Sequence, residues 1–153
     1  MRNSDDVAIP ALHELGSMSM GSDNLTQYLV DLEILSEIIP LIERSKSTTV
    51  VKECCRLISK IIAGTQWQIQ AVIDAGIMPS ILKVLDLGDL KCHFESSWAA
   101  ANLALGNAAK QVLCLLEENA FPILCPALAH SNLDLLINIL EFFHTLLNVV
   151  SSW

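Results

Sequence analysis

Three side chains of one segment have the types and the spacing needed to hold a positively charged group. Trp98 and Asn102 are four residues apart and so share one face of a helix, and Glu95 lies three residues before Trp98. An indole ring presents a flat π surface that attracts a lysine or arginine side chain by about 0.5–2 kcal/mol. An amide offers both a donor and an acceptor, and a carboxylate adds attraction for a cation.

Each of the three residues also has a plainer explanation. Trp98 can be a core residue, because aromatic rings bury a large apolar area wherever they pack. Glu95 can be a solvated acid that suits the start of a helix. Asn102 lies in a segment rich in alanine and leucine, where a buried amide needs a partner, so it indicates either an exposed face or a bond to the backbone.

The sequence contains no pattern typical of catalysis or of a metal site. The four histidines and the scattered acids form no local acid–base or nucleophile motif. Cys92 and His93 are adjacent, but no second pair of ligands follows at a spacing typical of zinc sites. We therefore expect no enzyme, no metal and no other cofactor.

The five cysteines indicate buried thiols in a reducing compartment, because they lie in apolar helical segments and form no Cys-x-x-Cys pair. They are Cys54, Cys55, Cys92, Cys114 and Cys125.

The composition favours a folded, acidic protein. Hydrophobic residues make up 52% of the 153 residues and charged residues only 17%, which excludes a disordered chain. The formal net charge of −8 repels phosphate backbones, so we expect cationic partners and no nucleic acid. The most apolar stretch, 135–150, contains Asn138, Glu141, His144 and Asn148, which would be costly in lipid, so we expect no membrane partner.

The chain repeats itself with a period near 43 residues. Gly21, Gly64 and Gly106 each close one helical run and open the next. The segment after Gly64 and the segment after Gly106 have Gln, acidic and Pro positions in common at an offset of 43. This period lies in the band of about 40–47 residues expected for armadillo and HEAT repeats.

Each unit divides into three helices, which favours armadillo over the two-helix HEAT repeat. In the second unit, we expect a short helix over 66–75 that ends at Gly76, a second helix over 80–87 preceded by Pro79, and a third over about 94–105. Further long helices are expected over 9–20 and 133–150. We thus expect an all-α, armadillo-repeat superhelical solenoid. Residues 1–153 would form one array of about three repeats, with incomplete terminal repeats and disorder over 1–9.

Three segments resemble the C-terminal armadillo repeats of the importin-α (karyopherin-α) family. They are residues 52–64, residues 68–77, which match the family almost letter for letter, and residues 95–102, which carry its Trp-x-x-x-Asn pair. Weaker copies lie at 11–16 and 138–141, so the resemblance extends over nearly the whole chain. It implies that the third helices line a concave groove that binds extended basic peptides, the nuclear localisation signals of cargo proteins.

The resemblance implies five peptide-binding residues, Trp98, Asn102, Glu95, Glu53 and Asn138. The repeat before the one with Trp98 departs from the pattern, because Arg56 and Lys60 stand where the family has Trp and Asn. Two cations in that place would repel a lysine-rich ligand, although Glu53 could neutralise Arg56 as an i, i+3 pair.

The implied function is protein import into the nucleus, with the protein in both the cytoplasm and the nucleus. Binding of importin-β is not expected, because the basic N-terminal segment that the family uses has no counterpart here. Two alternatives stay open: an armadillo scaffold whose ligand is not a localisation signal, and a truncated paralogue without transport activity.

Overall fold

The computed structural model describes residues 4–86, 90–105, 113, 116–117, 119–129 and 131–151. These residues form helices joined by turns, and no strand occurs among them. The helices are α1 (Ser4–Ser19), α2 (Asp23–Asp31), α3 (Ile34–Arg44), α4 (Thr48–Ile62), α5 (Gln66–Asp74), α6 (Met78–Asp86), α7 (Leu90–Leu105), α9 (Ala120–Leu124), the 3₁₀ helix η1 (Cys125–Ala129) and α10 (Leu133–Ser151).

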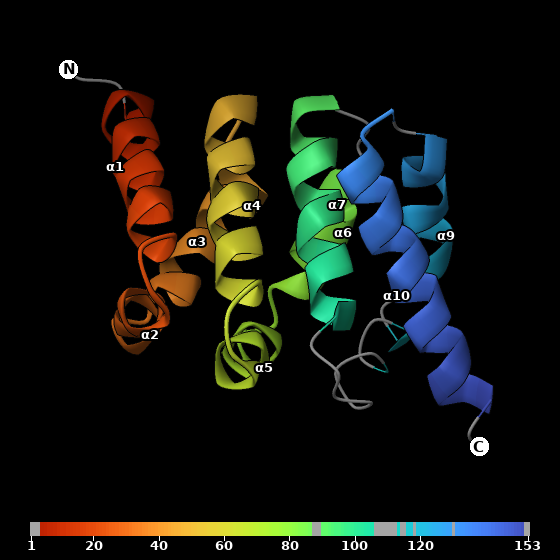
Figure 1. The fold of residues 1–153 in the computed structure, drawn as a ribbon. Helices are drawn as coiled ribbons and strands as arrows, with labels where there is room; N and C mark the ends of the chain where they lie inside the picture. Colours follow the sequence, from red (N-terminus) through yellow and green to blue (C-terminus); the bar gives the residue numbers. More distant parts are fainter. Residues whose placement is uncertain are drawn as a thin grey trace.

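The long helices α1, α4, α7 and α10 stand side by side in one row and run in the same direction (Figure 1). Each contacts its neighbour in the row, and α3 and α6 pack behind α4 and α7. The short helices α2 and α5 lie across the C-terminal ends of the row. The expected all-α solenoid is thereby confirmed, and Arg56, Trp98 and Asn138 lie on successive helices of the row, as predicted.

Local signals in the sequence fix most helix ends. The Thr65 side chain accepts a hydrogen bond from the backbone N–H of Gln68, and the Gln68 side chain accepts one from Thr65, which forms a capping box at the start of α5. Gly76 takes a left-handed conformation, with φ +68°, directly after the C-cap of that helix. Pro79 lies in the first turn of α6, where its missing N–H is not needed.

The buried Gln68 also joins two repeats. Its side-chain amide donates to the backbone carbonyl oxygen of Asp23 at 2.8 Å, so α5 is tied to the start of α2. The glutamine that recurs in the sequence is therefore a structural residue in this repeat.

The core is continuous through the stack. Its most buried members come from successive repeats and include Ile38, Leu57, Ile61, Ile81 and Leu103 of the helices and Ile77 of the turn before α6. A second, smaller cluster joins Leu135 and Ile139 of α10 to Phe94 and Trp98 of α7. No repeat covers its own apolar faces, and stacking supplies the burial.

Two long helices begin earlier than the sequence predicts. Helix α1 starts at Ser4, where disorder was expected through residue 9. Asp5 and Asp6 suit its N-terminal dipole, and Ile9 packs against the core. Helix α7 starts at Leu90 rather than near Phe94. In its first turn Cys92 is buried, and the thiol donates to the Thr48 carbonyl oxygen of α4 at 3.3 Å.

Among the described cysteines one differs from the expectation, and Cys114 lies outside the described residues. Cys54, Cys55 and Cys92 are buried, as predicted, whereas Cys125 is exposed. Cys125 begins η1, and the proline that follows it disfavours continuation of the α-helix. Burial raises the pKa of the Cys54 and Cys55 thiols to about 12, so both stay protonated and unreactive at neutral pH.

Helix α10 is the most apolar helix described. By length and composition this helix of 19 residues could cross a membrane, with a mean hydropathy of 1.5, but a helix of a soluble core passes the same test. In the structure one side of α10 buries Leu135, Ile139 and Phe142 against the stack. Leu140 and Leu147 are exposed on it, as expected for the last helix of a row.

Replacing Gly76 by alanine should lower the free energy of unfolding by about 1 kcal/mol, because an alanine pays a steric cost at positive φ. A Cβ there would meet no atom within 4 Å, so the loss reports the backbone conformation alone. Gly76→Asn is the matched control and should lose less, since asparagine tolerates this region. Urea denaturation measures both, and equal losses for the two variants would contradict the explanation.

Candidate functional site

A hollow of about 530 Å³ opens where α4, α7 and the start of α10 meet. We call it the α4/α7 groove. It is lined by Arg56, Ser59 and Lys60 of α4, Phe94, Glu95, Trp98 and Asn102 of α7, Asn132 and Asp134 at the start of α10, and Met20 and Ala63 from the connecting turns. The structure thus brings together three of the five site residues expected from the sequence.

Trp98 takes part in both the core and the groove. Its ring meets the ring of Phe94 edge to face, with centroids 6.3 Å apart and planes at 70°. One side of the indole packs against Leu135 and Ile139, and the half-buried residue lines the groove with its remaining surface. Trp98 therefore belongs to an apolar cluster and also lines the groove.

Asn102 links the two walls of the groove. Its half-buried side-chain amide donates to the backbone carbonyl oxygen of Ser59 on α4 at 3.3 Å. This is the backbone partner that a polar residue in an apolar helix requires. The bond is long, and the amide oxygen keeps its capacity to accept from a ligand.

Glu95 lies half-buried at the same face of α7. Burial raises the pKa of its carboxyl group above the usual range, and the nearby charges of Lys52, Arg56 and Lys60 offset this only in part. Within the described part of the chain, no ion pair closer than 4.0 Å involves Glu95. A cation that entered the groove would therefore meet a carboxylate not yet paired.

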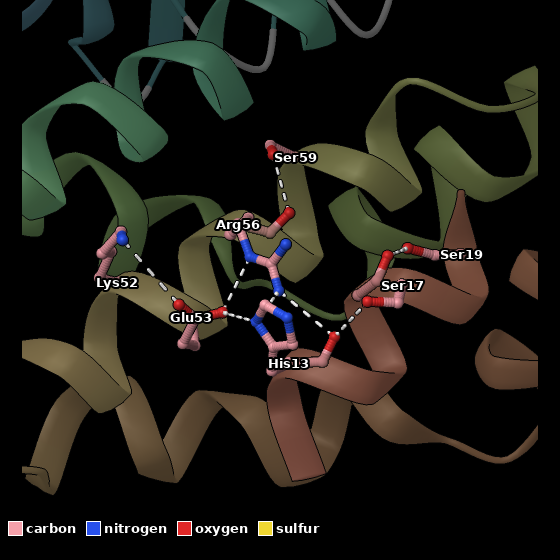
Figure 2. Close-up of polar contacts among 8 residues, drawn as sticks. His13, Ser17, Ser19, Lys52, Glu53, Arg56 and Ser59 are labelled. Carbon is pink, nitrogen blue, oxygen red and sulfur yellow. Dashed lines mark hydrogen bonds and ion pairs between the residues drawn. The ribbon is translucent and has the colours of Figure 1, made fainter. Parts of the chain in front are cut away.

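The opposite wall carries a closed polar network, which Figure 2 shows. Arg56 Nε donates to Glu53 Oε2 at 2.8 Å. One terminal nitrogen of Arg56 lies 3.0 Å from His13 Nδ1 and donates to the His13 carbonyl oxygen at 3.3 Å. A guanidinium group only donates, so Nδ1 of His13 accepts in this arrangement. The same nitrogen lies over Gly16 of α1, where a Cβ would come within 3.1 Å of it.

This network alters how strongly the charge of Arg56 can act on a ligand in the groove. The predicted pairing of Glu53 with Arg56 is confirmed, so the charge of Arg56 is largely compensated. Glu53 is 8% exposed and is not among the residues that line the groove. Sequence reasoning missed His13 as the third member, because its contact with Arg56 crosses 43 residues.

Lys60 follows Arg56 by one turn and lines the groove, half-buried. No carboxylate lies within 4.0 Å of its ammonium group in the described part of the chain. Across the groove, Asp134 at the start of α10 is exposed and also lacks an ion pair among the described residues.

The fifth expected site residue, Asn138, lies on α10, but its side chain is outside the described residues. One turn later, Phe142 stands where the expected pattern has its asparagine and is 1% exposed. In α10 the asparagine position of the pattern is thus occupied by a buried core residue.

Two other hollows result from repeat stacking. One of about 330 Å³ lies between α3, α4, α6 and α7, and one of about 540 Å³ lies between α1, α3 and α4. Their linings correspond at an offset of 43, as for Asp5 and Thr48 or Glu37 and Ser80. They have neither an aromatic ring nor the Glu–Trp–Asn set, so the α4/α7 groove is the candidate site.

Comparison with curated proteins finds importin-α subunits. The chain is 49% identical over 58 residues to importin subunit alpha-2 of Caenorhabditis elegans, which is 38% of this chain and 11% of that protein. It is 41% identical over 75 residues to importin subunit alpha-1a of Oryza sativa subsp. japonica, 49% of this chain and 14% of that protein. Over 126 residues it is 32% identical to importin subunit alpha-8 of Arabidopsis thaliana, 82% of this chain and 29% of that protein. The chain thus spans less than a third of the length of these relatives, and no protein-family model matches it.

Among solved structures, the chain is similar to designed armadillo repeat proteins. The match to one of them has a TM-score of 0.86 and 28% sequence identity, and it covers 94% of this chain and 59% of the designed protein. The match to a second, solved in complex with the peptide (KR)4, has a TM-score of 0.83 and 28% identity, and it covers 95% of this chain and 60% of that protein. The armadillo fold and the resemblance to importin-α repeats expected from the sequence are confirmed.

Removing Arg56 should destabilise the fold, because Glu53 would be left buried without its main partner. We expect Arg56→Leu to lose about 2 kcal/mol of unfolding free energy, below the roughly 3–5 kcal/mol of fully buried pairs, since the Arg56 side chain is 18% exposed. The double variant Glu53→Leu with Arg56→Leu should recover at least half of this loss.

The matched control is Lys52→Leu. The Lys52 ammonium lies 4.0 Å from Glu53 and its side chain is 37% exposed, so its loss should stay within about 0.5 kcal/mol. Thermal or urea unfolding measures the series. A double variant as unstable as Arg56→Leu would contradict the pairing.

Proposed function

We propose that these importin-α-like armadillo repeats bind an extended peptide in the α4/α7 groove, that a basic side chain of the peptide lies beside Trp98, and that this binding serves protein import into the nucleus. The observation that carries the proposal is the presence of Glu95, Trp98 and Asn102 on one wall of one groove, with part of the indole accessible. The cargo would be proteins with basic localisation segments, and the protein would act in both the cytoplasm and the nucleus.

Each of the three residues has a distinct part in the proposed binding. The indole of Trp98 would contact the methylenes and the charged head of a lysine. Asn102 would accept from the peptide backbone through its amide oxygen, which fixes the position of the peptide without reading its side chains. Glu95 would draw the charge. The structure solved with the peptide (KR)4 gives support from a protein of similar fold, at 28% identity.

A second function is an armadillo scaffold whose ligand is not a localisation signal. Arg56 and Lys60 on the α4 wall favour it, because cations there select against a purely basic peptide. A truncated paralogue without transport activity is the third outcome. It would show an intact fold and no affinity for any basic peptide.

Truncating Trp98 should weaken binding of a lysine-rich peptide by about 1–3 kcal/mol, the range of interface aromatics. Trp98→Leu keeps apolar contact with Leu135 and Ile139 and tests the π surface without emptying the core. Asn102→Ala should cost about 1 kcal/mol by removing a backbone acceptor. Fluorescence anisotropy of a labelled peptide, at two salt concentrations, measures the affinities.

Trp67→Leu is the matched control for the truncation. Trp67 is 82% exposed on α5 and does not line the groove, so its loss should leave peptide affinity unchanged. If the Trp67 and Trp98 variants bind every basic peptide as the unaltered protein does, the proposal fails and only the fold remains.

Affinity for a basic peptide should rise with pH through the titration of Glu95. The folded protein holds the pKa of Glu95 above its usual range through burial. A bound cation favours the ionised carboxylate, so binding releases a proton and strengthens as pH rises through that pKa. Glu95→Gln should flatten this rise. An unchanged pH profile in Glu95→Gln would exclude contact between Glu95 and the ligand.

A further inference from the structure

The two walls of the α4/α7 groove differ in charge. On the α7 and α10 side, Glu95 and Asp134 present carboxylates. On the α4 side, Arg56 and Lys60 present cations. A ligand with a single kind of charge is attracted by one wall and repelled by the other.

The two cations of the α4 wall are not equivalent. Arg56 is held by Glu53 at 2.8 Å and by His13, so its charge is met within the protein. Lys60 has no carboxylate within 4.0 Å among the residues that the structure describes. Burial raises the pKa of Glu95, and Lys60 is one of three nearby cations that lower it. No ion pair joins Lys60 to Glu95 within 4.0 Å in the part of the chain that the structure describes. Lys60 is therefore the uncompensated cation of the groove lining.

Asn102 joins the two walls next to Lys60. Its amide donates to the carbonyl oxygen of Ser59, the residue directly before Lys60. The proposed backbone anchor of the ligand thus lies one helical turn from Trp98 and is bonded to the neighbour of Lys60. An extended peptide at this point directs successive side chains to opposite sides.

We infer, on the basis of the proposed function, that the groove selects peptides of mixed charge, in which an acidic residue stands next to the basic residue held at Trp98. The basic side chain faces Trp98 and Glu95, and the neighbouring acidic side chain faces Lys60. A peptide of basic residues alone would place a second cation against Lys60, which acts as a repulsive element for that class of ligand.

Three labelled peptides of equal length test this inference: one alternating lysine and aspartate, one alternating lysine and asparagine, and one of lysine alone. The overall charge of −8 attracts the all-lysine peptide most strongly at long range. Binding is therefore measured at roughly 0.15 M salt, where the screening length falls to about 8 Å. A preference for the lysine–aspartate peptide then has to arise from groups within the groove.

We expect the unaltered protein to bind the lysine–aspartate peptide about three- to fivefold more tightly than the lysine–asparagine peptide, as for one partly exposed charge pair. Lys60→Gln should remove this preference, and Lys60→Glu should turn it toward the all-lysine peptide. Lys46→Gln is the control, because it removes one exposed cation outside the groove and should leave the order of the peptides unchanged.

The outcomes separate the inference from the proposed function. If the all-lysine peptide binds in a Trp98-dependent manner and as tightly as the lysine–aspartate peptide, the mixed-charge inference is wrong and the proposed function stands. If Lys60→Gln still prefers the lysine–aspartate peptide to the lysine–asparagine peptide, the inferred role of Lys60 is wrong as well. If none of the three peptides binds, or if Trp98→Leu leaves all affinities unchanged, both fail together.

Discussion

The burial of one long helix against the next is the interaction on which the rest of this protein depends. Neighbouring helices in the row of α1, α4, α7 and α10 contact one another, and the core passes from repeat to repeat without interruption. Because each repeat leaves apolar faces that only its neighbours cover, the spacing of the row is fixed by packing. The groove exists because α4, α7 and α10 are held side by side. Phe94 and Trp98 of its lining take their positions from packing against Leu135 and Ile139.

The same constraint explains how the candidate site can be polar and still stable. Trp98 gives one side of its ring to the apolar cluster with Leu135 and Ile139, which fixes the ring, and keeps the rest for the groove. The side-chain amide of Asn102 donates to the Ser59 carbonyl oxygen, so this half-buried amide is not left without a hydrogen-bond partner. Arg56 and Glu53 neutralise each other before any ligand arrives. The proposed peptide binding therefore uses only the parts of Trp98 and Asn102 that are not occupied by packing or by internal hydrogen bonds.

Local signals were sufficient to predict most of the fold. Gly76 and Pro79 mark the end of α5 and the start of α6 because their backbone requirements are independent of the rest of the chain. The early starts of α1 and α7 were not predictable in this way, since packing against other repeats decides them. At the site, the pair of Glu53 and Arg56 follows from a separation of three residues on one helix. The contact of Arg56 with His13 joins two repeats, and no short-range pattern in the sequence indicates it.

The hydrogen bonds between repeats are not spread evenly along the chain. Those from Arg56 to His13 join α4 to α1. At the next junction, described side-chain bonds occur at three levels: Gln68 to Asp23 between the short helices, Ser80 to Glu43 between α6 and α3, and Asn102 to Ser59 between α7 and α4. The repeats that carry the two walls of the α4/α7 groove are therefore joined behind the groove as well as at it, so a bending load on the solenoid would leave the width of this groove largely unchanged.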